Sequence, residues 1–352
     1  MIKILHLNNY ISYASGVTRY LYNLIKYTRN EFTHEIICFG GDAFELFYNQ
    51  NIKITSIKYR GLVSIPFLYI CLLNYYQRSR FDIIHNHHRI FDSITSFYPF
   101  SKIKRVTTVH SKVYGRTRFS YMANKIISVS NSITKHLITH HKVNPEKILQ
   151  IKNFVDLGNK NLEVVENELR NRLNLNDQKV ILFVGRFSKE KGADILLKAF
   201  KEYFESNKKI SLILIGEGEE EKQLKEFCKK YQLPVKFISP VSNIYDYYNL
   251  ADVVVLPSRV DPFPFVMLET GLMRKPFIGS NVDGIPELIK HKVNGVLFQN
   301  ENVNELVKSF QMILEDKLFA QQIADNLYKD VVENYTAVKV IPEYVNFYNS
   351  LI

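Results

Sequence analysis

The segment Val253-Val-Val-Leu-Pro-Ser258, followed two residues later by Asp261-Pro-Phe-Pro-Phe-Val-Met-Leu-Glu269, combines an apolar strand, a turn and the start of a helix. Four consecutive aliphatic residues predict a strand that is buried on both faces, and the Pro-Ser pair ends it. A strand that delivers its loop to a helix N-terminus is a common phosphate site, because unpaired backbone N–H groups and the helix dipole both point at the anion.

Two carboxylates, Asp261 and Glu269, stand eight residues apart around this helix start. Neither carboxylate can itself bind phosphate, so we expect both to face neutral, hydroxyl-rich parts of a ligand. A ligand with phosphates in its middle and hydroxyls at both ends is a nucleotide-sugar. The structural alternatives are that Asp261 is a helix N-cap before a first-turn proline, and that Glu269 is an exposed helix residue.

A second segment, Gly185-Arg186-Phe187-Ser188-Lys189-Glu190-Lys191-Gly192, also follows an apolar strand and opens a helix. We expect Gly185 to permit a close approach of the backbone to the ligand. Arg186 and Lys191 bring two cations to one helix mouth, where a diphosphate would gain charge-assisted hydrogen bonds. The alternative is two solvated cations near an ordinary helix start.

Short apolar runs alternate with helical patterns along the whole chain, which predicts parallel sheets covered on both sides. The expected strands cover residues 3–7, 35–39, 52–57, 82–85, 105–110 and 126–129, and then 180–184, 212–215, 235–238, 253–256, 277–279 and 296–298. The expected helices include 16–27, 67–78, 193–206, 219–231 and 304–314. The fold class is therefore α/β, with two Rossmann-like parallel-sheet domains facing each other across a cleft.

The length of 352 residues exceeds what one core usually organises, and a polar stretch rich in Asn and Glu, residues 157–177, separates the two halves. The expected domains are residues 1–158, on the side that would bind the acceptor of a transferred sugar, and residues 159–334, which would bind the nucleotide-sugar. Residues 335–352 are expected to form a helix that packs back toward the N-terminal domain.

Charge is distributed unevenly along the chain. Residues 1–160 hold 22 of the 46 basic residues but only 8 of the 35 acidic ones, and no acidic residue lies between Asp92 and Glu146. Such asymmetry indicates either an anionic partner, such as a membrane surface or a lipid-phosphate acceptor, or a merely solvated basic face. The basic residues are not organised into a recognised nucleic-acid module, so nucleic acid is not an expected partner.

Three widely spaced cysteines form neither a disulfide framework nor a metal set, which is typical of a reducing cytosol. The first residues, 1–7, predict a strand rather than a signal peptide. The longest uncharged run containing a helical pattern, residues 61–77, is too short to span a bilayer and predicts a buried or surface-docking helix.

In order and spacing these motifs resemble the family 4 glycosyltransferases of the GT-B fold. The resemblance rests on Gly-Arg-x4-Lys-Gly, Gly216-Glu-Gly218 and the acid-x7-acid segment, and supporting pieces run along the chain. These pieces are Gly16, Ile127-Ser-Val-Ser130, Asn153-Phe-Val-Asp156, Leu250-Ala-Asp252, Gly284-Ile-Pro-Glu287 and Asn294-Gly295.

The resemblance implies a role for each matching residue. Arg186 and Lys191 would hold the diphosphate and stabilise the leaving nucleotide. Glu269 would accept the ribose hydroxyls, and Asp261 would face the donor sugar. The remaining implied donor contacts are the backbone amides of Phe265, Val266 and Met267, the first-loop residue Gly16, Val241 beside the base, and His110 near the reacting centre.

The sequence departs from the family pattern at three places. Asp261 stands where Glu is usual, and its side chain is shorter by about 1.5 Å. Ala14-Ser15-Gly16 replaces a Gly-Gly pair, and Phe154 stands where Gly is expected.

The histidines admit structural roles as well, since nine of the ten precede residue 142. His110 is either a sugar contact or a structural residue. The group His85, His87 and His88 lacks a carboxylate at ligand spacing, so no metal site is expected. Gly216-Glu-Gly218 lacks the third glycine of a dinucleotide fingerprint.

The expected function is transfer of a sugar, with retention of configuration, from a UDP-, GDP- or ADP-sugar to a hydroxyl acceptor. No cofactor and no metal are expected, because cations and helix dipoles neutralise the leaving group. The expected acceptor is a glycan or a lipid-linked glycan in bacterial surface polysaccharide or glycolipid assembly, and the expected location is cytoplasmic and peripheral on the membrane. The alternatives are another GT-B enzyme, such as a nucleotide-sugar epimerase, and a catalytically silent subunit that binds nucleotide-sugar.

Overall fold

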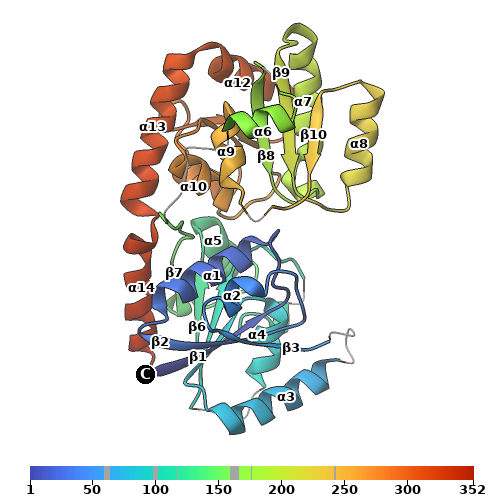
Figure 1. Ribbon diagram of the computed structural model, residues 1–352. Helices are drawn as coiled ribbons and strands as arrows, with labels where there is room; N and C mark the ends of the chain where they lie inside the picture. Colours follow the sequence, from blue (N-terminus) through green and yellow to red (C-terminus); the bar gives the residue numbers. More distant parts are fainter. Residues whose placement is uncertain (59–63, 98–101, 116, 159–165, 176, 242) are drawn as a thin grey trace. The chain divides into compact units, whose positions relative to one another are not determined.

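The computed structural model describes residues 1–352 except 59–63, 98–101, 116, 159–165, 176 and 242 (Figure 1). The chain divides into two compact units. Unit 1 comprises Met1–Asn153 and Ala337–Ile352, and unit 2 comprises Phe154–Thr336. The two connecting segments lie side by side within unit 2, because Val155 N–H donates to the carbonyl of Tyr335 at 2.9 Å.

Unit 1 is built on a seven-stranded parallel sheet with the strand order β3-β2-β1-β4-β5-β6-β7. Its strands are β1 (Ile2–Asn8), β2 (Phe32–Cys38), β3 (Lys53–Ser56), β4 (Ile83–Asn86), β5 (Lys104–Val109), β6 (Lys125–Ser128) and β7 (Ile148–Gln150). Its helices are α1 (Gly16–Thr28), α2 (Glu45–Tyr48), α3 (Ser64–Ser79), α4 (Arg89–Ser96), α5 (Asn131–Thr139) and α14 (Ala337–Ser350), with short 3-10 turns at Thr117–Phe119 and Pro145–Lys147.

The two faces of this sheet differ in character, because alternate residues of a strand point to opposite faces. Leu5 and Leu7 of β1 join an apolar core that α3 and α4 complete. His6, between them in sequence, lies on the other face. It contacts His34 and His85, which in turn contact Thr28 of α1 and Tyr348 of α14. The second face therefore carries buried polar groups.

Unit 2 is built on a six-stranded parallel sheet with the order β10-β9-β8-β11-β12-β13. Its strands are β8 (Lys179–Val184), β9 (Ile210–Ile215), β10 (Val235–Ile238), β11 (Val253–Leu256), β12 (Phe277–Ser280) and β13 (Val296–Phe298). Its helices are α6 (Glu166–Arg172), α7 (Ala193–Ser206), α8 (Glu221–Lys230), α9 (Tyr245–Leu250), α10 (Phe265–Leu272), α11 (Ile285–Leu288), α12 (Val303–Glu315) and α13 (Lys317–Asn334), with a 3-10 turn, η4, at Lys189–Lys191.

The expected α/β class is confirmed, since each unit is built on a parallel sheet whose strands alternate with helices. The predicted strands 235–238, 253–256 and 296–298 match β10, β11 and β13 residue for residue. The short strand β7 is not among the predicted strands. Within the described residues, none of the helices has both the length and the apolarity that crossing a membrane requires.

Candidate functional site

The first functional segment of unit 2 lies where the loops after β8 and β11 meet. Gly192 has φ +71°, and a Cβ at this position would lie 2.1 Å from the carbonyl oxygen of Pro257. Both features exclude a side chain, so glycine allows the two loops to touch. At Gly185 the nearest atom to an added Cβ is 3.3 Å away on Phe183, whereas a Cβ at Gly216 would lie 2.0 Å from the Gly185 carbonyl oxygen. The expected close approach of Gly185 to a ligand stays a prediction.

Lys191 and Asp261 form an ion pair across this junction. Lys191 Nζ lies 2.6 Å from Asp261 Oδ2, and the two side chains are 29% and 4% exposed. Ser258 Oγ donates to the same carboxylate oxygen at 3.2 Å. Two of the predicted site residues, 70 positions apart in sequence, are therefore in direct contact.

Arg186 belongs to the same loop but points into solvent. Its side chain is exposed, and among the described residues it has no hydrogen bond or ion pair. The pKa of nearby Glu190 is held below its usual range by hydrogen bonds from its own backbone N–H and from Ser188, and the charges of Arg186 and Lys191 add to this effect. The Arg186 guanidinium is therefore the cation of this loop that is available to a ligand, since Lys189 and Lys191 pair with Asp194 and Asp261.

The backbone of Asp261 is fixed by the loop that precedes α11. Asp261 N–H donates to Asp283 Oδ2 at 3.1 Å, and Gly284 N–H donates to the Asp261 carbonyl at 3.1 Å. A Cβ at Gly284 would lie 1.5 Å from the carbonyl oxygen of Pro262, so only glycine fits there. Asp261 is 3% exposed and its orientation is fixed from both sides.

Helix α10 begins at Phe265, and its N-cap residue is Pro264. The alternative that Asp261 is the N-cap is therefore wrong. Pro264 provides no side-chain hydrogen bond to the first turn, and the N–H groups of Phe265, Val266 and Met267 have no intrahelical acceptor by the geometry of a helix start. These three amides form the kind of cradle that binds an anion.

Glu269 lies one turn further along α10 and is 1% exposed, so the alternative of an exposed helix residue is also wrong. Its Oε2 accepts a hydrogen bond from the Tyr248 hydroxyl at 2.7 Å. Tyr248, in α9, is completely buried. Val241, expected beside the base, is half-buried in the segment between β10 and α9.

In unit 1, Gly16 and His110 follow β1 and β5, at the carboxyl edge of the sheet. Gly16 is the first residue of α1, whose N-cap Ser15 accepts a hydrogen bond from Thr18 N–H. His110 lies against Tyr20 with ring centroids 4.7 Å apart. Burial lowers the pKa of His110 to about 3, so this imidazole is neutral at physiological pH.

Beneath α1, three imidazoles form a directed hydrogen-bond chain. Thr28 Oγ1 donates to the Leu24 carbonyl at 2.6 Å, so it must accept from His34 Nε2–H at 3.0 Å. His34 Nδ1 then accepts from His6 Nε2–H at 2.9 Å, and His6 Nδ1 accepts from His87 Nε2–H at 3.0 Å. The tautomers follow because each neutral ring has one donor and one acceptor nitrogen.

His6, His85 and His87 also place one nitrogen each within 4.8 Å of one another, close enough to suggest a metal site. Both nitrogens of His85 are already engaged, by Tyr348 Oη and Thr108 Oγ1 at 2.7 Å each. His6 Nδ1 is engaged with His87 Nε2 and His6 Nε2 with His34 Nδ1, whereas His87 Nδ1 is buried and has no hydrogen-bond partner among the described residues. The absence of a metal stays a prediction.

Comparison with known proteins places the chain in a family. Residues 165–330 match the family description "Glycosyl transferases group 1", and residues 14–159 match "Glycosyltransferase Family 4". The chain belongs to glycosyltransferase family 4. The resemblance drawn from the sequence is therefore confirmed.

Two relatives of this family are similar over about two thirds of the chain. The uncharacterized glycosyltransferase MJ1607 of Methanocaldococcus jannaschii is 30% identical over 250 residues, which are 68% of this chain and 63% of that protein. The capsular polysaccharide biosynthesis glycosyltransferase CapM of Staphylococcus aureus is 26% identical over 245 residues, which are 66% of this chain and 63% of that protein. The chain thus spans less than two thirds of the length of these relatives.

A solved structure with the same fold is that of Alr3699/HepE from Anabaena in complex with UDP-glucose. It superposes with a TM-score of 0.88 over 99% of this chain and 100% of that chain, at 22% sequence identity. At this identity the likeness establishes the fold alone.

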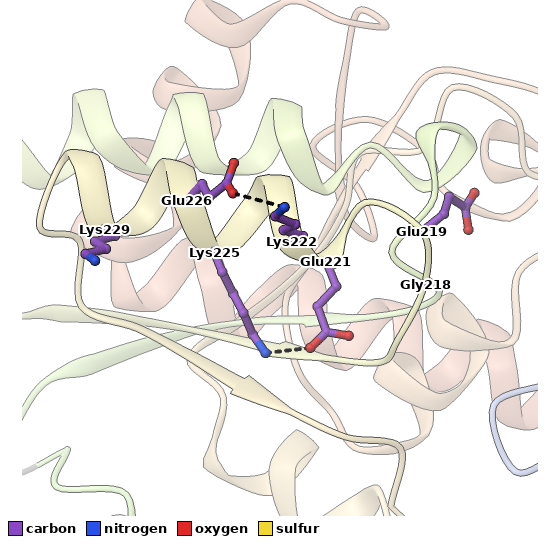
Figure 2. A pocket seen from close by; sticks show the side chains of 7 residues that line it. All are labelled: Gly218, Glu219, Glu221, Lys222, Lys225, Glu226 and Lys229. Atoms are coloured by element: carbon purple, nitrogen blue, oxygen red, sulfur yellow. Dashed lines mark hydrogen bonds and ion pairs between the residues drawn. The ribbon is translucent and has the colours of Figure 1, made fainter.

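Helix α8 borders a separate hollow of about 540 Å³ in unit 2. Figure 2 shows its charged lining, in which Lys225 pairs with Glu221 at 2.6 Å and Lys222 with Glu226 at 4.0 Å. Because these charges neutralise one another along one helix face, the hollow resembles an ordinary solvated surface.

Three residues that hold the predicted site residues or their loops in place are not part of the family motifs and were not predicted from the sequence. Tyr248 holds Glu269, Asp283 holds the backbone of Asp261, and Arg259 joins the two loops. Arg259 follows Ser258 directly in the quoted strand-and-turn segment, but nothing in its local pattern identifies its partners.

Proposed function

We propose that this family 4 glycosyltransferase moves a sugar from a nucleoside-diphosphate-sugar to a hydroxyl acceptor, with retention of configuration. The observation that carries the proposal is the junction in unit 2, where Lys191, Asp261 and the open amides of α10 converge. A cation, a buried carboxylate and a helix N-terminus within one loop cluster fit a ligand that combines phosphates with hydroxyls.

In the proposed binding mode the diphosphate lies over the first turn of α10, where Lys191 and Arg186 balance its charge. Glu269, oriented by Tyr248, accepts the ribose hydroxyls. Asp261 accepts hydroxyls of the sugar. The donor is a UDP-, GDP- or ADP-sugar, and UDP is the first probe because HepE, of the same fold, has been crystallised with UDP-glucose.

In the reaction, the bond between the anomeric carbon and the phosphate oxygen breaks and a bond to the acceptor oxygen forms on the same face. The acceptor hydroxyl gives its proton to the departing phosphate oxygen. No second protein carboxylate is then needed as a base, in contrast to glycosidases. Arg186, Lys191 and the α10 amides stabilise the charge that develops on the nucleotide, and no metal is required.

In unit 1, we assign Gly16 and His110 to the donor as well. Gly16 is the first residue of α1, and the N-terminus of this helix lies at the carboxyl edge of the sheet. The backbone amides of a helix N-terminus are suited to a phosphate contact. His110 is neutral and therefore suited to hydrogen bonding with a sugar hydroxyl rather than to pairing with an anion.

The experiment is a thermal-shift screen against UDP, GDP, ADP and CMP and their sugars, followed by transfer assays with the donor that stabilises the protein. We expect Arg186→Ala and Lys191→Ala each to lower turnover by about a hundredfold to a thousandfold, as for the loss of one group that stabilises developing charge. Arg274→Ala, which removes an exposed arginine two residues after the end of α10, is the control. Normal turnover in both loop variants would refute the proposed mechanism.

The same assay separates the other candidate functions. Conversion of the donor sugar without an acceptor would identify an epimerase. Donor binding with neither transfer nor hydrolysis would identify a catalytically silent subunit.

For the acceptor we propose a glycan linked to an anionic lipid, used at the cytoplasmic face of a membrane in surface polysaccharide or glycolipid assembly. Support comes from the basic charge of unit 1 and from exposed apolar side chains. Phe67 and Ile70 lie on α3, and Phe97 and Phe119 form a second exposed pair with ring centroids 6.2 Å apart. Basic residues with exposed aromatic groups favour an anionic membrane surface.

Flotation with phosphatidylglycerol vesicles at low salt tests this part. We expect binding that falls as salt increases and that weakens in a Phe67→Ser/Ile70→Ser variant. No flotation at low salt would indicate a soluble acceptor.

A further inference from the structure

Arg259 has the most extensive set of polar contacts around the phosphate-binding loops. Its Nη1 and Nη2 donate to the two oxygens of Asp194 at 2.8 and 2.9 Å, and its Nε donates to Glu301 Oε1 at 2.7 Å. Nη1 also donates to the carbonyl of Lys189 at 2.7 Å, and the Arg259 backbone N–H donates to the carbonyl of Glu190 at 2.6 Å. Four of the five side-chain N–H groups therefore have a partner.

These partners belong to three different segments. Lys189 and Glu190 form η4, the turn that carries Lys191, and Asp194 is in the first turn of α7. Glu301 lies between β13 and α12. Arg259 itself lies two residues before Asp261. One side chain thus ties the loop of Lys191 to the loop of Asp261.

Two carboxylates, Asp194 and Glu301, already pair with Arg259, so its guanidinium is not available as a phosphate ligand. Burial alone would raise the pKa of Asp194, but the hydrogen bonds and charge of Arg259, with those of Lys189, hold it below its usual range. The hydrogen bond to Asp194 in turn raises the pKa of Arg259. The Arg259 side chain is 16% exposed and is paired with the carboxylates of Asp194 and Glu301, whereas Arg186 is exposed and has no ion pair among the described residues.

Lysine would keep the charge but not all of these contacts, because only the planar fork of arginine binds both oxygens of one carboxylate while it serves two further acceptors. The contact of Gly192 with Pro257 brings the loops together, and Arg259 fixes their relative position.

We propose that Arg259 is a positioning residue for donor phosphate binding: it holds η4 so that Lys191 and Arg186 meet the diphosphate in the correct place. This inference rests on the proposed function. A displacement of about 1 Å in such a site can lower the rate or affinity by about a hundredfold, although the displaced residue never touches the ligand.

The test measures the affinity of the protein for UDP and for uridine. GDP is compared with guanosine, and ADP with adenosine, in the same way. We expect Arg259→Gln to weaken binding of the diphosphate by about a hundredfold while the affinity for the nucleoside stays unchanged. Arg259→Lys should retain part of the diphosphate affinity. Arg274→Gln, which removes an exposed arginine paired with Asp325 at 3.2 Å, is the matched control and should change neither affinity.

Hydrogen exchange of the ligand-free protein gives an independent result. We expect the amides of residues 185–192 to exchange faster in Arg259→Gln than in wild type, with β8 and β11 unchanged. Unaltered exchange there, unaltered diphosphate affinity, or an equal loss of diphosphate and nucleoside affinity would each overturn the inference. If wild-type protein binds none of the three diphosphates, the proposed function fails and this inference fails with it.

Discussion

Acidification should destabilise unit 1 selectively, because several of its histidines are held in the neutral state by burial, among them the contact group of His6, His34, His85 and His87. Burial is the main reason that the pKa values of His6, His85 and His87 lie well below 6.5, and it lowers the pKa of His34 to about 4. The unfolded chain therefore binds more protons than the folded one between pH 6.5 and about 4. Stability is complete above this window and is lost as the pH falls through it.

The magnitude follows from the proton balance. Between pH 7.5 and pH 5.5, each imidazole that titrates at 6.5 when unfolded but stays neutral when folded costs about 1.4 kcal/mol. His6, His34, His85 and His87 are at most 4% exposed, so solvent does not reduce this value much. The four together should lower the free energy of unfolding of unit 1 by about 5 kcal/mol, a large share of the stability of an ordinary domain.

Hydrogen exchange at increasing urea concentrations, corrected for the intrinsic pH dependence of exchange, measures this effect in each unit separately. Unit 2 is the internal control, since its one histidine, His291, is exposed. The opening free energies of β1 and β4 should fall by several kcal/mol on acidification, and those of β8 and β11 should hardly change. An equal change in both units would refute the account of the histidine network.

Three further predictions concern single contacts. Tyr248→Phe removes the hydrogen bond to buried Glu269 and should raise KM for the donor about tenfold and lower the free energy of unfolding by about 1 to 3 kcal/mol, as measured by donor titration and calorimetry. Gly284→Ala should destabilise unit 2 by more than about 1 kcal/mol in urea unfolding, because the added methyl group collides with the Pro262 carbonyl; unchanged stability would show that the loop can move aside. Tyr348→Phe should cost about 1 to 3 kcal/mol by leaving a buried nitrogen of His85 without its partner, and hydrogen exchange in α14 would report the loss.

The sequence allowed much of the fold to be predicted because the signals for strands and helix starts are local. The run Val253–Leu256 is apolar throughout and lies between turn residues, so its limits follow from its own composition. The start of α10 was harder, since Asp261 before a proline has the features of an N-cap. The structure shows the cap three residues later, at Pro264.

The contacts that fix the site could not be predicted in the same way, because they join residues that are far apart in sequence. Arg259 and Asp194 are separated by 65 positions, and His6 and His87 by 81. Each partner is compatible with an exposed or a structural role when its own segment is considered alone. Only the packing of parallel strands brings such residues to one edge or one face of a sheet.

We propose that the loops after β8 and β11, with the first turn of α10, bind the diphosphate of a nucleotide-sugar. The most direct test is the hydrogen-exchange footprint of whichever of UDP, GDP and ADP stabilises the protein. We predict that within unit 2 protection is concentrated in residues 185–192 and 258–269, and that it is lost from both segments in Lys191→Ala. Protection along α8, or none in these two segments, would contradict it.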